Sequence, residues 1–406
     1  MRATAAIRAI AFSALLLSSS VLVLTAPARA DAWTKLDMGI PYSGTVSRGL
    51  CKVAVGDGDN DNSTEVYFSG WDDGHVYRFN YSDGNWNYWD LGKLVSANDV
   101  RARGMLVGDG DDDGLNEVYV SGVYRDWWWQ PWTNRLWRFS WNGETWDKTD
   151  MGASGATSRD IALGDGNNDG RQELYSADAT GHVYEYSKGN EWNVQDIGSV
   201  PKFYDEGTGT WVTPAVRGVS VGDADNDGFN EVYAATSDHH VYRFSYDNAS
   251  ATWDLGDVGT GVDDGTSDNY YQGFTKVVVG DADNDGLMEA YASSYINATV
   301  YRFKWNSTTA AWERTSLVSL GVKENAHDLC IGDGNSDGLN EIYAGTSNKQ
   351  VYEVFFNDTS GQWESLAVGS GNAAMNGVAF FPGSWPPSPG FDPWAILISS
   401  CSARAR

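Results

Sequence analysis

The sequence predicts an all-β protein, a seven-bladed β-propeller built from four-stranded antiparallel blades. Three observations lead to this fold class: a repeat every 52 to 58 residues, four strand-like runs in each repeat, and chain ends that match parts of a repeat. Periods of this size indicate stacked supersecondary units, and four short strands per unit are typical of propeller blades. A string of independent small domains is disfavoured, because a lone four-stranded sheet cannot bury both faces.

Each repeat reads as an apolar strand, Gly-Asp, an acidic loop, Glu-x-Tyr, a turn, Val-Tyr-Arg-Phe or a variant, a second turn, and a strand containing Trp. In the fourth copy, strands are expected at 216–221, 231–235 and 240–246 and around Trp253. Val, Tyr and Phe favour strands, and Asp, Asn and Gly favour the turns between them. The six copies have their Gly-Asp pairs at Gly56, Gly108, Gly164, Gly222, Gly280 and Gly332.

The two ends of the chain predict how the ring closes. Residues 33–39 (WTKLDMG) match the end of a repeat at 146–152 (WDKTDMG), and residues 375–380 (MNGVAF) match a first strand. We therefore expect six full repeats plus one blade shared by the N- and C-termini, which would protect the strand edges. This seventh blade has no Gly-Asp loop, and its next strand candidate is 394–398.

The N-terminus reads as a signal peptide, residues 1–30. It has Arg2 and Arg8, an apolar run at 10–24, and an Ala-Arg-Ala pattern that ends at Ala30. A membrane anchor is the alternative, but the run is short for a span. We expect a secreted or cell-surface protein, a propeller over 31–398, a tail over 399–406, no membrane span after signal cleavage, and a monomer.

The charge excludes one class of partner. The chain has 55 acidic and 28 basic residues and a net charge of -27. Nucleic-acid binding needs clustered Lys and Arg, so it is not expected. The 19 Trp, 21 Tyr and 14 Phe residues argue against a disordered acidic chain. The carboxylates must therefore have a place within a folded protein.

The acidic loops place many of these carboxylates at metal-ligand spacing. Each of the six copies fits D-x-[DN]-x-D-[GN]-x-x-E, with oxygen side chains at positions 1, 3, 5 and 9. Such ligands in a flexible cage suit Ca²⁺ better than Mg²⁺ or a transition metal. The predicted ligands are Asp57, Asp59, Asp61, Glu65, Asp109, Asp111, Asp113, Glu117, Asp165, Asn167, Asp169, Glu173, Asp223, Asp225, Asp227, Glu231, Asp281, Asp283, Asp285, Glu289, Asp333, Asn335, Asp337 and Glu341.

The recurrence of these residues favours up to six structural Ca²⁺ ions over solvated Asp-Gly turns, which would not place Glu at one distance six times. The closing acid comes at position 9 and the flanks are strands, so the loop is not an EF-hand. Asn167 and Asn335 keep an oxygen but lack a charge, and Asn62 at position 6 tolerates the left-handed conformation. Copies two, four and five carry the strongest loop charge.

The stretch 222–231 (GDADNDGFNE) resembles the calcium loop of FG-GAP/VCBS repeat proteins, which include the integrin α-subunit propeller and many secreted microbial proteins. The resemblance spans about residues 31–381 and implies calcium binding and a binding platform, with no named ligand. The chain departs from the integrin pattern, since it has no literal Phe-Gly…Gly-Ala-Pro motif and has Glu at position 9. The Glu form also resembles loops of propeller polysaccharide lyases and lectins.

Two further groups are candidates for ligand binding. A loop in the second repeat carries Trp127, Trp128, Trp129 and Trp132, which suit sugar stacking or a protein contact unless they fold back onto the blade. Arg103, Arg159, Arg217 and His327 stand five residues before the repeat Gly, with Thr275 in the fifth copy. They would ring one mouth of the channel and hold an anion. The alternative, which we favour, is a contact between blades.

Binding is the expected function: adhesion, or recognition of an extracellular glycan or protein. The alternatives are a polysaccharide lyase or another carbohydrate-active enzyme, and a structural surface protein. An enzyme is not favoured, because no Gly-x-Ser-x-Gly, His-Glu-x-x-His or zinc Cys pattern is present. His75, His182 and His240 precede the Val-Tyr pairs of their repeats, and this repetition indicates a role at strand ends.

Overall fold

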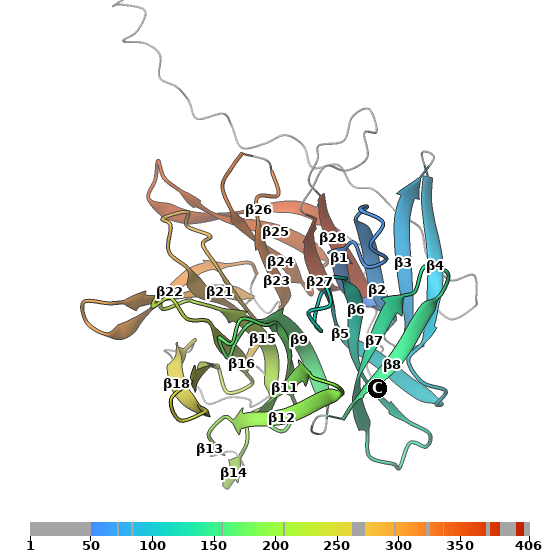
Figure 1. Cartoon of the computed structure of the whole chain (residues 1–406). Coiled ribbons are helices and arrows are strands. Elements are labelled where there is room, and N and C mark those ends of the chain that lie inside the picture. The colour runs from blue at the N-terminus through green and yellow to red at the C-terminus, as the bar shows by residue number, and fades with distance from the viewer. Residues whose placement is uncertain are drawn as a thin grey trace, which may run out of the picture. The chain divides into compact units, whose positions relative to one another are not determined.

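The computed structural model describes residues 50–70, 73–82, 85–153, 155, 157–205, 208–261, 273–295, 298–321, 325–335, 337–370, 374–381 and 395–401. All of them belong to the second of two compact units, Met38–Arg406. This part of the chain is all β, as predicted, and it contains no helix that could span a membrane (Figure 1). The predicted signal peptide and the strand over 33–39 lie outside the described residues.

Six antiparallel sheets of four strands form the blades. Blade 1 comprises β1 (Leu50–Gly56), β2 (Glu65–Gly70), β3 (His75–Ser82) and β4 (Asn85–Lys93). Blade 2 comprises β5 (Asp99–Gly108), β6 (Glu117–Arg125), β7 (Thr133–Trp141) and β8 (Trp146–Gly152). Blade 3 comprises β9 (Ser158–Gly164), β10 (Glu173–Asp178), β11 (His182–Lys188) and β12 (Trp192–Ser199).

The second half of the chain repeats this plan. Blade 4 comprises β15 (Val216–Gly222), β16 (Glu231–Thr236), β17 (His240–Asp247) and β18 (Thr252–Thr260). Blade 5 comprises β19 (Phe274–Gly280), β20 (Glu289–Ser294), β21 (Thr299–Asn306) and β22 (Ala311–Ser319). Blade 6 comprises β23 (Ala326–Gly332), β24 (Glu341–Thr346), β25 (Gln350–Asn357) and β26 (Gln362–Ser370).

Two smaller sheets complete the described part. A hairpin of β13 (Phe203–Asp205) and β14 (Thr210–Val212) lies between blades 3 and 4 in sequence, and β27 (Ala374–Phe381) pairs with β28 (Ala395–Cys401). First strands of successive blades contact one another, and β27 contacts both β23 and β1. The prediction of four-stranded blades is confirmed for six of them. The sheet next to β1 has two described strands, and β28 continues beyond the predicted boundary at residue 398.

The blades meet through a contact that explains the repeated Trp. Tyr67 of blade 1 is fully buried and meets Trp146 of blade 2 edge-on, with ring centroids 6.1 Å apart. The same Tyr–Trp contact joins the next four pairs of blades, at 6.1 to 6.3 Å. Such T-shaped pairs stabilise packing beyond their buried area. The Trp of the fourth strand in blades 2 to 6 therefore packs between blades.

The repeated glycine of the first five Gly-Asp pairs is required by the close approach of neighbouring blades. A Cβ at Gly56 would lie 2.6 Å from Val107 Cγ1 on the next first strand, and one at Gly164 would lie 2.7 Å from Val221 Cγ1. Gly56 also pairs in register with Glu65, and the equivalent Gly–Glu pair opens every acidic loop. The fold thus sets all six loops at one place in their blades.

Candidate metal centre

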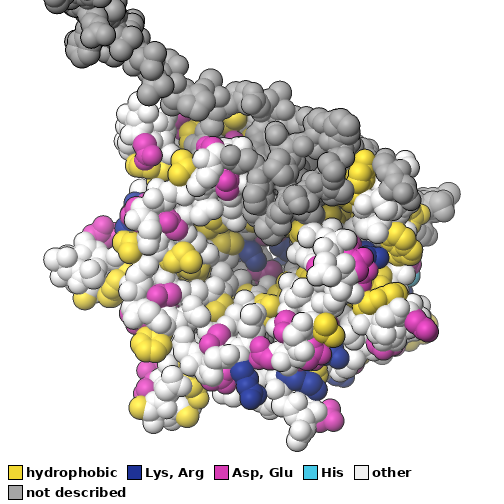
Figure 2. Space-filling view, turned by 45° about the horizontal axis from the view of Figure 1, so that its top comes forward, with side chains coloured by type: hydrophobic (Ala, Val, Ile, Leu, Met, Phe, Trp, Pro, Cys, Tyr) yellow, Lys and Arg dark blue, Asp and Glu magenta, His cyan; other side chains and the backbone are white. Residues whose placement is uncertain are grey.

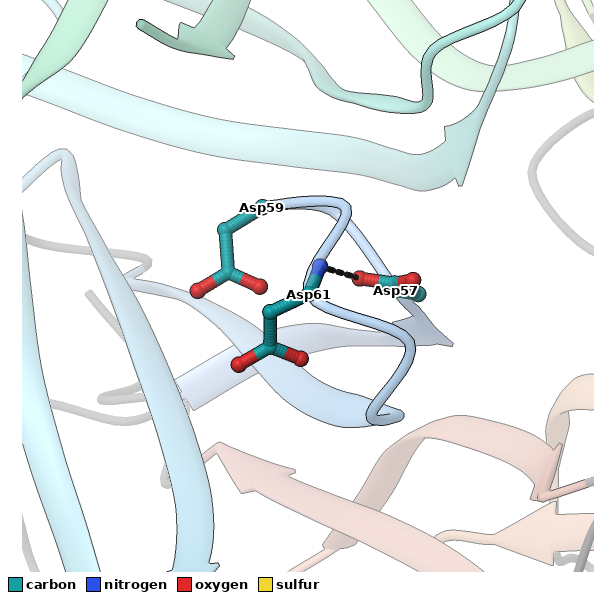
Figure 3. A group of neighbouring side chains, drawn as sticks. All are labelled: Asp57, Asp59 and Asp61. Atoms are coloured by element: carbon teal, nitrogen blue, oxygen red, sulfur yellow. Dashed lines mark hydrogen bonds between the residues drawn. The ribbon is translucent and has the colours of Figure 1, made fainter. Parts of the chain in front are cut away.

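Each acidic loop connects the first strand of a blade to the second. In loop 1, Asp57 Oδ1 accepts a hydrogen bond from the Asp61 N–H at 3.0 Å (Figure 3). Asp57 Oδ2 accepts one from the Asn62 N–H at 2.9 Å. The first Asp of every other loop accepts the same two bonds, at 2.9 to 3.1 Å. These bonds close the loop around its carboxylates.

Two residues adopt the left-handed backbone conformation in each of loops 1 to 5, and in loop 6 the described Gly338 does. Asn60 and Asn62, at positions 4 and 6 of loop 1, have φ angles of 59° and 67°. In the later loops the described residues at position 4 are Asp or Asn with φ of 53° to 58°, and the Gly at position 6 has φ of 86° to 94°. Asn, Asp and Gly tolerate this conformation best. The prediction for Asn62 is confirmed.

Side chains at position 4 connect the loops of neighbouring blades. Asn226 Nδ2 donates to the Met288 carbonyl, and the Met288 N–H donates back to Asn226 Oδ1, both at 2.9 Å. The same exchange joins loop 1 to loop 2, loop 3 to loop 4, and loop 5 to loop 6. In loop 2, Asp112 accepts the Gln172 N–H instead. Sequence reasoning missed these bonds, because position 4 has no role as a metal ligand.

The Asp at position 3 carries a buried oxygen atom without a partner. This holds for Asp59, Asp111, Asp225 and Asp283, whose side chains are only 6 to 8% exposed. Their Oδ1 atoms form no hydrogen bond within the described part of the chain. Burial raises the pKa of all four carboxyl groups above the ordinary value. An unsatisfied buried carboxylate oxygen is costly, and a bound cation would satisfy it.

The Glu at position 9 is the most buried acid of each loop. All six are at most 3% exposed, and each accepts a hydrogen bond of 2.6 to 3.2 Å from the hydroxyl of the Tyr two residues later. Burial raises the pKa of Glu65 and Glu117 to about 7, and that of Glu173 and Glu231 to about 8. A cation beside these groups would favour their ionised form.

A basic residue on the third strand completes four of the loops, and sequence reasoning missed it. Arg78 forms ion pairs with Asp59 and, at 2.9 Å, with Glu65. Arg138, Arg243 and Arg302 pair with the position-3 Asp of their own loops. In blade 5, Lys304 also reaches Glu289 at 2.8 Å. The arginine recurs in the Val-Tyr-Arg-Phe run of the sequence. Its pairing with the loop aspartate, however, depends on the register between the second and third strands.

Four of the predicted ligand sets converge. In loops 1, 2, 4 and 5, three acids offer oxygen atoms that lie within 4.8 Å of one another. Loops 3 and 6 have Asn167 and Asn335 at position 3, and Asn335 Nδ2 donates to Glu341 and Glu353 at 3.1 Å. The predicted charge ranking of copies two, four and five counted the loops alone and omitted the arginine that offsets part of that charge.

The tryptophan loop between β6 and β7 presents an exposed aromatic surface. Trp127 and Trp129 stack with centroids 5.2 Å apart and planes at 11°, and Trp128 is 78% exposed. Trp132 differs, because it is half-buried between the guanidinium groups of Arg101 and Arg125, at 4.4 and 4.2 Å. Three of the four tryptophans are therefore available to a ligand, and the fourth holds the loop in place.

The other predicted ligand residues lie on first strands. Arg103 lies on β5, Arg159 is exposed on β9, Arg217 lies on β15 and His327 lies on β23. Tyr295 lies beside two of them, 5.6 Å from the Arg217 guanidinium and 6.2 Å from the His327 ring. Thr275 Oγ1 donates to the Ala326 carbonyl of the next blade at 2.5 Å. These contacts agree with the favoured alternative of links between blades.

The geometry defines the class of protein: a β-propeller of four-stranded antiparallel blades with an acidic loop in each full blade. No family model matches the chain, and no curated protein matches it. Among solved structures, the crystal structure of Saccharomyces cerevisiae Sqt1 is similar, with a TM-score of 0.51 and 9% sequence identity, over 87% of this chain and 94% of that one. At this identity the likeness shows the fold alone.

Proposed function

We propose that this protein is a secreted, calcium-binding, seven-bladed β-propeller that serves as a binding module for an extracellular glycan. The observation that carries the calcium part is the buried, partnerless oxygen of Asp59 and of its three counterparts. Side chains at positions 1, 3, 5 and 9 would hold the ion, and bound Ca²⁺ would supply charge that screens the mutual repulsion of the carboxylates. Its role would be structural.

Metal removal tests this part of the proposal. Chelation with EDTA should lower the melting temperature by many degrees, because binding to the folded state alone stabilises it. Restored Ca²⁺ should reverse the shift, and Mg²⁺ should reverse less of it. A melting temperature that changes neither with EDTA nor with added Ca²⁺ would refute calcium binding.

The glycan part depends on the exposed Trp127, Trp128 and Trp129. Flat aromatic faces are suited to the apolar faces of sugar rings, and an exposed cluster of this kind marks an interaction site. Arg125 fixes the loop, since it donates to the Trp128 carbonyl at 2.9 Å and to Asp99 at 3.1 Å. A fixed platform loses little conformational entropy when a ligand binds.

A glycan array compares the wild type with the double variant W127A/W129A. The matched control is W211A, which removes another exposed tryptophan from the β13–β14 hairpin. We expect glycan binding in the wild type and in the control, and its loss in the double variant. Equal profiles for all three proteins would exclude the tryptophan loop. Binding to extracellular protein alone would replace the glycan with a protein partner.

The seventh blade and the export signal are further parts of the proposal. Residues 33–39 match the last strand of a repeat, and β27 contacts the first strands of blades 6 and 1. We therefore expect the N-terminal segment to add an outer strand to the β27–β28 sheet after removal of residues 1–30. Mass spectrometry of the exported protein should find Asp31 as its first residue. Deletion of residues 31–39 should lower the melting temperature.

The carbohydrate-active enzyme remains a second candidate, but the histidines do not favour it. His75 Nδ1 lies 2.8 Å from Asp90 Oδ2, and His182 and His240 form the same contact with the acid on their own fourth strand, at 2.8 and 3.2 Å. A contact that repeats in three blades indicates a structural role, as the sequence predicted. An assay for polysaccharide cleavage by the wild type tests this candidate.

A further inference from the structure

Blades 3 and 6 differ from the other four blades at two positions: position 3 of the loop, and the third-strand residue that pairs in register with the buried Tyr. In blade 1, Arg78 on β3 pairs in register with Tyr67, and Asp59 stands at loop position 3. In blade 3, the residue in register with Tyr175 is Glu185, and position 3 is Asn167. Blade 6 shows the same exchange, with Glu353 in register with Tyr343 and with Asn335 in the loop.

Glu185 is buried without a compensating charge. It is 6% exposed, and it has no hydrogen bond or ion pair within the described ranges of the chain. Asp169 and Glu173 lie close enough to repel it. A buried carboxylate among other carboxylates is strongly disfavoured unless a cation lies beside it. Glu185 thus adds a buried carboxylate to this loop from the third strand, where blade 1 has Arg78.

We propose that Glu185 and Glu353 belong to the metal sites of blades 3 and 6, and that these two sites bind calcium more tightly than the other four. This inference rests on the proposed calcium binding. The site of blade 3 has four carboxylates, Asp165, Asp169, Glu173 and Glu185, and the basic residue of its loop, Arg171, is exposed. In blade 1 the guanidinium of Arg78 already compensates one of the four carboxylates, and it repels an incoming cation.

The charge around each loop also predicts the order of calcium affinity among the remaining sites. Calcium affinity rises with the net negative charge of the ligand shell. The loop acids of blades 1, 2 and 4 each pair with one arginine, whereas those of blade 5 pair with both Arg302 and Lys304. Blades 3 and 6 are therefore filled first, blades 1, 2 and 4 next, and blade 5 last.

Calorimetric titration of the metal-depleted full chain with Ca²⁺ tests the inference. The wild type should show two tight sites, at least about tenfold tighter than the rest. The double variant E185Q/E353Q should lose the tight class, and the control E144Q/E191Q, which changes two exposed glutamates, should keep it. A wild type that binds no calcium would refute the proposed function. Binding that is equal in all three proteins would refute only the inference.

Thermal melting of the same variants, with and without Ca²⁺, gives a second readout. It separates a role of Glu185 and Glu353 in metal binding from a role in packing alone. With metal removed, E185Q/E353Q should melt at or above the wild-type temperature, because two repelling charges are gone. With saturating Ca²⁺ it should melt below the wild type. A general packing defect would lower both temperatures together, and that result would overturn the assignment.

Discussion

An ion pair that passes across one blade should contribute strongly to the stability of the ring. Lys52 Nζ on β1 lies 2.9 Å from Asp328 Oδ2 on β23, and β27 contacts both strands. The two side chains are 15% and 7% exposed, and Asp328 also accepts the Val378 N–H at 3.2 Å. The central hollow contains basic and acidic side chains (Figure 2). Lys276 and Asp160 form an equivalent pair between β19 and β9.

Lys52→Met would leave Asp328 buried without its counter-charge. Breaking a buried pair on one side costs about 3–5 kcal/mol. The retained bond from Val378 places the expected loss near the lower end, at about 3 kcal/mol, or about 4 °C in melting temperature for a chain of this length. Lys276→Met should have a similar effect, since its pair has similar burial.

Differential scanning calorimetry in saturating Ca²⁺ at neutral pH measures this loss. Lys202→Met is the control, because it removes an exposed lysine. The double variant K52M/D328L should recover most of the loss, since it leaves no unpaired charge. If K52M has the same melting temperature as the K202M control, the Lys52–Asp328 pair does not stabilise the ring and the reasoning fails.

Two other changes probe the loops and the first strands. Asn226→Ala should cost about 2–3 kcal/mol in denaturant unfolding, because it loses both bonds to Met288 and strains a left-handed residue, whereas Asn226→Gly should cost about 1–2 kcal/mol. Equal stability of the two variants would contradict this. Burial, aided by Lys52, lowers the pKa of His327 to about 4. The unfolded chain takes up this proton near pH 6.5, so stability should fall between about pH 6.5 and 4, by up to about 3 kcal/mol. An unchanged pH profile in His327→Gln would contradict this.

The sequence predicts the blades well because each strand signal is local and recurs six times. Alternating Val, Tyr and Phe and the Asp-Gly turns fix where strands begin and end, and the six loops lie where the motif places them. Contacts between blades are harder to predict from the sequence, because they depend on how the strands are aligned with one another. The exchange of bonds between Asn226 and Met288, which are 62 residues apart, leaves no local signal.

The tryptophan loop, a candidate ligand site, also shows that contacts between strands are hard to predict from local sequence. Composition alone indicated that four tryptophans on one loop cannot all be core residues. Trp132 nevertheless lies between Arg101 and Arg125, and only the pairing of β5, β6 and β7 brings these two arginines together. Sequence patterns therefore identified the surface, and tertiary packing decided which of its members is available.

Blades 3 and 6 share more than their loops. They also carry Asp160 and Asp328, the acids of the two pairs that pass across a blade. Blades 3 and 6 thus resemble each other in both features. Asn with Glu and Asp with Arg are then two alternative pairings that each limit the charge around a loop.

A double-mutant cycle tests this last point. Asn167→Asp alone would add a fifth carboxylate to the site of blade 3 and should destabilise the metal-free protein, whereas Glu185→Arg alone would replace a repelling carboxylate with a counter-charge. Together they recreate the arrangement of Asp59 and Arg78 in blade 1. The double variant should therefore be more stable than the sum of the single changes predicts, by at least about 1 kcal/mol. Additive effects of the two changes would mean that the two positions vary independently.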